Sequence, residues 1–93
     1  MSVVIIGGDE CMVRKYKDLC EEYKCRAKVF VKMTAELKNK IGNPDLMVLF
    51  TGTASHKMVK CAVSEAKGNR TVIAKSHSSS ASALKGILDT YVT

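Results

Sequence analysis

The chain has 93 residues and a hydrophobic content of 46%, enough for one packed domain over residues 1–93 but not for a deep pocket, so a homo-oligomer is expected. Its net charge of +6 favours anionic ligands, whereas Lys and Arg scattered along the sequence and 5% aromatic residues argue against nucleic acid. The sequence lacks the run of about 18 apolar residues that spans a membrane, and residues 1–8 do not resemble a signal peptide, so a cytoplasmic protein is expected.

The chain opens with a β-branched run, residues 2–6, that predicts a strand buried on both faces. Gly7 and Gly8 allow a sharp turn, and Asp9 is a good N-cap for a helix over residues 10–24. Apolar residues recur in this helix at spacings of three and four, at Met12, Val13, Tyr16, Leu19, Cys20 and Tyr23.

The middle of the chain predicts a second strand, a short helix and a third strand. Residues 27–31 alternate weakly, as in an edge strand, with Lys28 opposing aggregation. Thr34 is expected to cap a short helix that ends at Gly42. Asp45 precedes the apolar third strand, residues 46–50.

The last part of the chain repeats the alternation of strand and helix. A turn of small polar residues, 51–55, leads into a helix that begins at His56 and ends at Gly68-Asn69. Residues 71–74 predict the fourth strand. Ser78 or Ser79 is expected to cap a final helix with an apolar face formed by Ala83, Leu84, Ile87, Leu88 and Tyr91.

Four β-α units predict an α/β three-layer sandwich of the flavodoxin or Rossmann type, with a parallel sheet in the order 2-1-3-4. Ligands of such sheets bind at the carboxyl ends of the strands, near the switch point between strands one and three. We therefore expect turns 7–9, 51–56 and 76–79 to meet at one rim. The candidate ligand-binding residues are Gly8, Asp9, Met12, Arg14, Thr51, Thr53, Ser55, Lys57, Ser78 and Ser79.

His56 is the candidate metal ligand. At the start of a helix it can present one imidazole nitrogen outward, as metal-ligating histidines do. The alternative is an ordinary surface histidine whose protonated form the helix dipole disfavours. His77 occupies a similar turn, but no acidic or Cys partner at suitable spacing completes a zinc site with it.

Other ligand classes remain open to different degrees. The turn after the first strand lacks the Gly-x-Gly-x-x-Gly fingerprint, so dinucleotide binding is disfavoured. Small anions or phosphometabolites can bind at the helix starts near Thr53–Ser55 and Ser78–Ser80, which gives a sensor or carrier as one alternative. No Gly-x-Ser-x-Gly elbow supports a hydrolase.

The cysteines form no Cys-x-x-Cys pair, and in a reducing compartment they are expected to be free thiols. Cys20 and Cys61 fall on apolar helix faces. Cys11 lies in the first turn of a helix, where the dipole lowers a thiol pKa, so a phosphoryl or redox carrier using Cys11 is a second alternative. The carboxylates of Asp9 and Glu10 oppose it.

The ordered motifs of the chain resemble a prokaryotic family, domain of unknown function 2325. The resemblance covers nearly the whole chain and rests on the following residues: the Val-Val-Ile-Ile-Gly-Gly-Asp start, Arg14, Lys15, Tyr16, Asp45, Ser55-His56 and Ser78-Ser79. It implies a small Rossmann-like cytoplasmic module, more consistent with a binding protein than with an enzyme.

The resemblance also implies haem as the cofactor. His56 would then ligate the iron in a module that binds or senses dioxygen or another gas, and Arg14 would donate to the bound gas. Met12, Val13, Phe50 and Met58 would form an apolar wall, and Lys57, Arg14 and Lys75 would meet the propionates. Because a haem is large for this chain, a second subunit is expected to complete the pocket.

Overall fold

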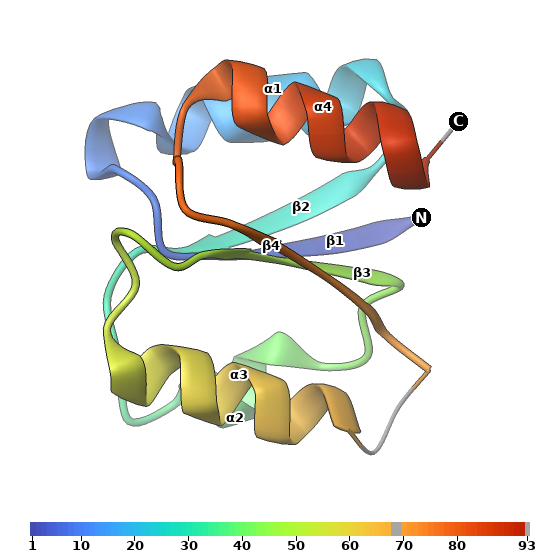
Figure 1. Cartoon of the computed structure of the whole chain (residues 1–93). Coiled ribbons are helices and arrows are strands. Elements are labelled where there is room, and N and C mark those ends of the chain that lie inside the picture. Colours follow the sequence, from blue (N-terminus) through green and yellow to red (C-terminus); the bar gives the residue numbers. More distant parts are fainter. Residues whose placement is uncertain (68–69, 93) are drawn as a thin grey trace.

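Strands and helices alternate along the chain in the computed structural model, which describes residues 1–67 and 70–92 (Figure 1). The elements in chain order are β1 (Ser2–Ile6), the 3₁₀ turn η1 (Glu10–Met12), α1 (Val13–Glu22), β2 (Arg26–Phe30), α2 (Leu37–Ile41), β3 (Leu46–Phe50), α3 (His56–Lys67), β4 (Val72–Ser76) and α4 (Ala81–Tyr91).

The four strands form one parallel sheet in the order β2-β1-β3-β4, which confirms the predicted α/β fold and strand order. The register pairs Ile6 with both Phe30 and Leu49, and Phe50 with Ser76, so all four strands end at the same rim. Figure 1 shows α1 and α4 on one face of the sheet and α2 and α3 on the other, which gives the three-layer sandwich.

The core consists of two apolar clusters separated by the sheet. Val3 and Ile5 face α1 and α4, whereas Val4 and Ile6 face α2 and α3, as the two-residue period of a strand requires. All five residues of β3 are buried. Each fully buried aliphatic side chain stabilises the fold by about 1.5–3 kcal/mol, so the two central strands anchor the sheet.

The first helix differs from its prediction at both ends. It opens with the 3₁₀ turn η1 and stops at Glu22 instead of continuing to residue 24. Lys24 adopts a left-handed φ of 58°, and the Cys25 N–H donates to the Cys20 carbonyl at 2.9 Å. This is the Schellman pattern, in which the flanking apolar side chains, here the buried Cys20 and Cys25, come together.

Two of the predicted helix caps are wrong. Thr34 does not cap α2, which begins at Leu37 after a Glu36 that makes no capping hydrogen bond. The last helix is capped by Ser80 rather than Ser78 or Ser79, since the Ser80 Oγ accepts from the Ala83 N–H at 3.2 Å. The Asp9 cap is confirmed, with its carboxylate accepting from Cys11 N–H at 3.0 Å.

Smaller differences concern strand ends and one apolar position. Pairing with β1 moves β2 one residue earlier than residues 27–31, and pairing with β3 carries β4 to Ser76, beyond the predicted end at residue 74. Tyr91 is 45% exposed, so it lies off the buried face of α4. The predicted end of the third helix at Gly68-Asn69 lies outside the described residues.

Candidate functional site

Three turns meet at the rim where the strands end. The Gly8 N–H donates to the Thr53 Oγ1 at 2.7 Å, which joins the turn after β1 to the turn after β3. The Thr51 N–H donates to the Ser76 carbonyl at 2.9 Å and joins the turn after β3 to β4. These bonds bring the predicted turns 7–9, 51–56 and 76–79 together.

Tyr16 ties the rim to the helix layer from within the core. Its ring is fully buried and lies 5.4 Å from the ring of Phe50, centroid to centroid. Its hydroxyl donates to the Ser79 carbonyl at 2.5 Å and accepts a longer bond from the Asp9 N–H at 3.4 Å. The sequence placed Tyr16 in the apolar stripe and among the family motifs but not at the rim. A buried tyrosine hydroxyl needs a hydrogen-bond partner, and this requirement could have pointed to the contact.

Glycine is required at two rim positions. Gly8 has φ +94°, and a Cβ there would lie 2.7 Å from the Tyr16 Cε2. A Cβ on Gly52 would collide with the backbone oxygen of His77. The turns therefore pack against one another without room for side chains.

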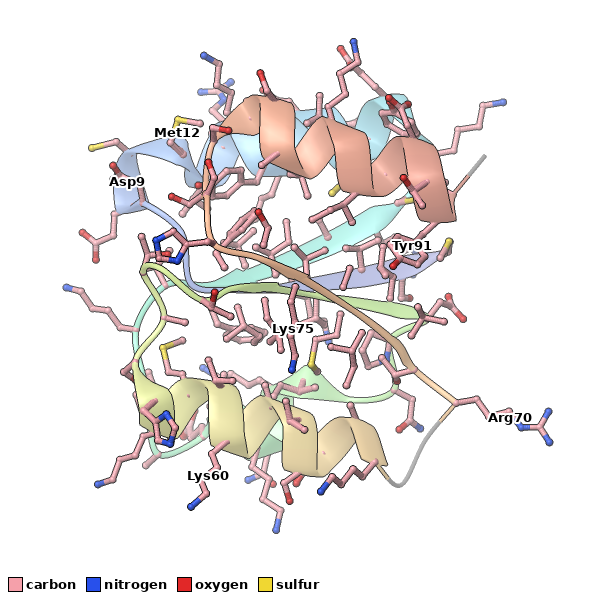
Figure 2. The ribbon with its side chains drawn as sticks, in the orientation of Figure 1. Asp9, Met12, Lys60, Arg70, Lys75 and Tyr91 are labelled. Atoms are coloured by element: carbon pink, nitrogen blue, oxygen red, sulfur yellow. The ribbon has the colours of Figure 1, made fainter. Side chains whose placement is uncertain are left out.

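A cavity of about 400 Å³ opens at this rim on the side of α1 and α4. Figure 2 shows the labelled Asp9 and Met12 beside the segment that leads into α4. The cavity is lined by Asp9, Met12, Ser78, Ser79, Ser80 and Ala81. Four of the predicted binding residues thus share one cavity with Ser80, which the sequence suggested only for a small anion, and Ala81 is the addition that the sequence did not suggest.

Two of the three serines that line this cavity form hydrogen bonds with each other. The Ser78 Oγ contacts the Ser80 Oγ at 3.2 Å and accepts from the Ser80 N–H at 3.3 Å, while Ser80 caps α4. These hydrogen bonds hold the start of α4 in place. Among the residues that line the cavity, Asp9 is the charged one.

His56 lies on the other side of the sheet from this cavity. It is the exposed first residue of α3, whereas Met12 and Arg14 belong to the layer of α1 and α4. The expected wall of Phe50 and Met58 is not formed. Their side chains are 0% and 1% exposed and belong to the two opposite core clusters, because β3 and α3 turn them inward.

Two hydroxyls next to His56 are already engaged in the fold. The Thr53 Oγ1 accepts from Gly8 and donates to the Phe50 carbonyl at 3.2 Å. The Ser55 Oγ accepts from the Met58 N–H at 3.2 Å and so caps the start of α3. Lys57, the next residue of α3, is exposed.

Neither the second histidine nor the thiols complete a metal site. Within residues 1–67 and 70–92, no group of three or more His, Cys, Asp or Glu side chains is placed to hold a metal ion. Cys11 is exposed in η1. Burial, and then the nearby Cys25, raise the pKa of Cys20 to about 11, so this thiol stays protonated at neutral pH. In the same part of the chain, no helix is long and apolar enough to span a bilayer.

Comparison with known proteins adds one finding. A family model described as an uncharacterized protein conserved in bacteria (DUF2325) matches residues 2–91. No curated protein and no solved structure matches the chain. The matched range contains every strand, helix and rim turn described above.

Proposed function

The chain belongs to the DUF2325 family, as its motifs predicted, and from that premise we propose that it is a non-enzymatic module that binds haem through His56. The observation that carries the proposal is the state of this imidazole. It is exposed at the start of α3, and within residues 1–67 and 70–92 no hydrogen bond or ion pair engages it. An imidazole nitrogen that is not committed to the fold is available to a metal.

The residues around His56 offer apolar surface for the haem ring and cations for its propionates. Val59 and Lys60 follow at three and four residues, so they share a helix face with His56. Ala54 and Val59 are half-buried and pack against the core, which leaves part of their apolar surface accessible. Lys57 and Lys60 are exposed cations that would pair with propionates. When bound, haem would supply an iron that holds dioxygen or another diatomic gas.

One chain would cover only part of a haem. The residues expected to form a wall, Phe50 and Met58, lie in the core, and His56 is the exposed first residue of α3. We therefore propose that a second copy of the chain covers the remaining face, in line with the homo-oligomer expected from the small core. Binding of haem and self-association would then be linked.

A visible absorption titration with haemin tests this proposal. The wild type is expected to shift the Soret band and to increase in mass in a sedimentation experiment. His56→Ala should lose the shift, whereas His77→Ala, which removes the other exposed histidine, should keep it. An identical spectrum for the wild type and His56→Ala would contradict ligation by His56.

The two alternatives receive less support. A small-anion carrier would use Thr53, Ser55 and Ser79, at the starts of α3 and α4. The hydroxyls of Thr53 and Ser55 already hold the turn and the start of α3, and Ser80, beside Ser79, already caps α4. A phosphoryl or redox carrier would use Cys11, whose N–H is bonded to the Asp9 carboxylate and whose neighbour Glu10 adds a second negative charge. Negative charge beside the thiol repels a phosphoryl group there.

A further inference from the structure

The fold divides the charged side chains unequally between the two sides of the sheet. We define the α2/α3 side as these two helices, the loops that adjoin them, and the strand side chains that face them. Ten of the 15 Lys and Arg residues lie there: Arg26, Lys28, Lys32, Lys38, Lys40, Lys57, Lys60, Lys67, Arg70 and Lys75. Only three of the nine acidic residues do, Glu36, Asp45 and Glu65, so the net positive charge is concentrated on this side.

The faces of the strand residues follow from their neighbours. Ala27 and Val29 pack against the α1/α4 cluster, so Arg26 and Lys28 alternate to the other side of β2. Ile73 packs against the α2/α3 cluster, which puts Lys75 of β4 on that same side.

Four exposed cations that form no ion pair within residues 1–67 and 70–92 lie along α3 and β4. We call Lys60, Lys67, Arg70 and Lys75 the α3/β4 patch; Figure 2 shows Lys60, Arg70 and Lys75 extending from α3, from the turn before β4, and from β4. All four are exposed, and none forms an ion pair with another residue of the described ranges. A shallow cavity of about 480 Å³ lies between Lys60 and Lys67.

The patch has cations but no apolar anchor. Of the exposed large hydrophobic residues within 1–67 and 70–92, only Met33 lies on the α2/α3 side, and the three tyrosines belong to the opposite layer or to its core. Protein interfaces and membrane surfaces are held by buried aromatic or aliphatic anchors. Binding to a phosphate backbone, in contrast, requires mainly Lys and Arg and releases counterions.

We propose that the α3/β4 patch binds the backbone of duplex nucleic acid without reading its sequence. Within the patch, Lys60 and Lys67 lie about 10 Å apart along the axis of α3, comparable to roughly three phosphates of one strand. Basic residues that are scattered along the sequence, which argued against nucleic acid, are brought together on one side of the folded chain. Aromatic side chains remain scarce, so bases have no ring on which to stack and the patch can contact only the phosphate backbone.

Fluorescence anisotropy with a labelled DNA duplex of about 20 base pairs tests the proposal at several salt concentrations. Lys67→Gln/Arg70→Gln/Lys75→Gln is expected to weaken binding about tenfold at low salt and to flatten the salt dependence. The matched control, Lys15→Gln/Lys17→Gln/Lys85→Gln, removes the same charge from exposed positions on the α1/α4 side and should weaken binding far less. Lys67→Arg/Arg70→Lys/Lys75→Arg should retain binding.

Several outcomes would overturn the proposal. These are an absence of binding by the wild type, equal losses in the two triple variants, or stronger binding to poly-glutamate or to anionic lipid vesicles than to DNA. Thermal melts of both triple variants check that the fold is intact. His56→Ala should bind DNA normally. Lys67→Gln/Arg70→Gln, which leaves every lysine expected near the propionates in place, should weaken DNA binding and keep its haem spectrum, so this inference and the proposed function fail independently.

Discussion

Gly8→Ala is expected to lower the free energy of unfolding by about 3 kcal/mol, because the new methyl group enters space that Tyr16 fills. The φ of +94° at Gly8 is disfavoured for an L-residue, at about 1–2 kcal/mol. The added Cβ would also lie 2.7 Å from the Cε2 and 3.0 Å from the hydroxyl of Tyr16. Tyr16 is 0% exposed and packed on Phe50, so it cannot yield freely, and overpacking of this kind costs about 1–3 kcal/mol.

Urea unfolding followed by far-UV circular dichroism measures this loss from the shift in midpoint at constant slope. Gly42→Ala is the control, since Gly42 has φ +65° but no atom within 4 Å of the position that a new methyl group would take, and it should report backbone strain alone. In a Tyr16→Leu background the cost of Gly8→Ala should fall by about 1 kcal/mol or more. If the cost is the same in both backgrounds, the steric explanation is refuted.

Three further predictions concern a thiol, a phenol and a helix cap. At pH 8 a maleimide should label Cys11 rapidly and Cys20 hardly at all, because Cys11 is exposed whereas burial raises the Cys20 pKa to about 11. The hydroxyl of Tyr23 donates a hydrogen bond to the carboxylate of Asp89 on α4. This bond raises the pKa of Tyr23 from 10.0 to about 12, so the fold favours the neutral phenol. That stabilisation is complete below pH 10 and is lost as the pH rises towards 12, a loss that Tyr23→Phe should not show in thermal melts. Ser80→Ala should destabilise the fold by about 1 kcal/mol, and Ser79→Ala by much less, in urea unfolding.

Each of these three predictions would be contradicted by a specific result. Equal labelling rates for the two thiols would mean that the layer of α1 opens readily. Parallel alkaline melting curves for the wild type and Tyr23→Phe would show that this phenol contributes nothing to the pH dependence. A larger loss for Ser79→Ala than for Ser80→Ala would restore the cap predicted from the sequence.

The parts of the fold that could be predicted are those set by burial and chain topology. The strands at residues 2–6 and 46–50 coincide with the observed β1 and β3, because central strands of a parallel sheet are apolar throughout. The start of α3 at His56 was also predicted, since small polar residues before an apolar periodic segment mark a helix start.

The parts that could not be predicted depend on contacts between distant segments. Three consecutive serines precede α4, and nothing local distinguishes Ser80 as the cap from Ser78 and Ser79. The end of β2 at Phe30 is set by pairing with Ile6, whose position is unknown until the sheet forms.

The error in the candidate site has a different cause, because the signal was present. In the order 2-1-3-4, right-handed crossovers place the first and third helices on opposite faces of the sheet. Met12 and Arg14 therefore had to lie across the sheet from His56, and an inward Phe50 could not form a wall with Met58. The strand order alone thus determines both the position of the rim and the face of the sheet on which each of these side chains lies.

The bonds of Tyr16 and Thr53 described above bear on the thermodynamics of the rim. These contacts already fix the turns after β1, β3 and β4. The loops therefore lose little conformational entropy when a ligand binds at the rim. Amide hydrogens of these turns should accordingly exchange with deuterium at nearly the same rates with and without a ligand. Recognition at this rim would follow a preorganised, rigid-body route rather than one of loop closure.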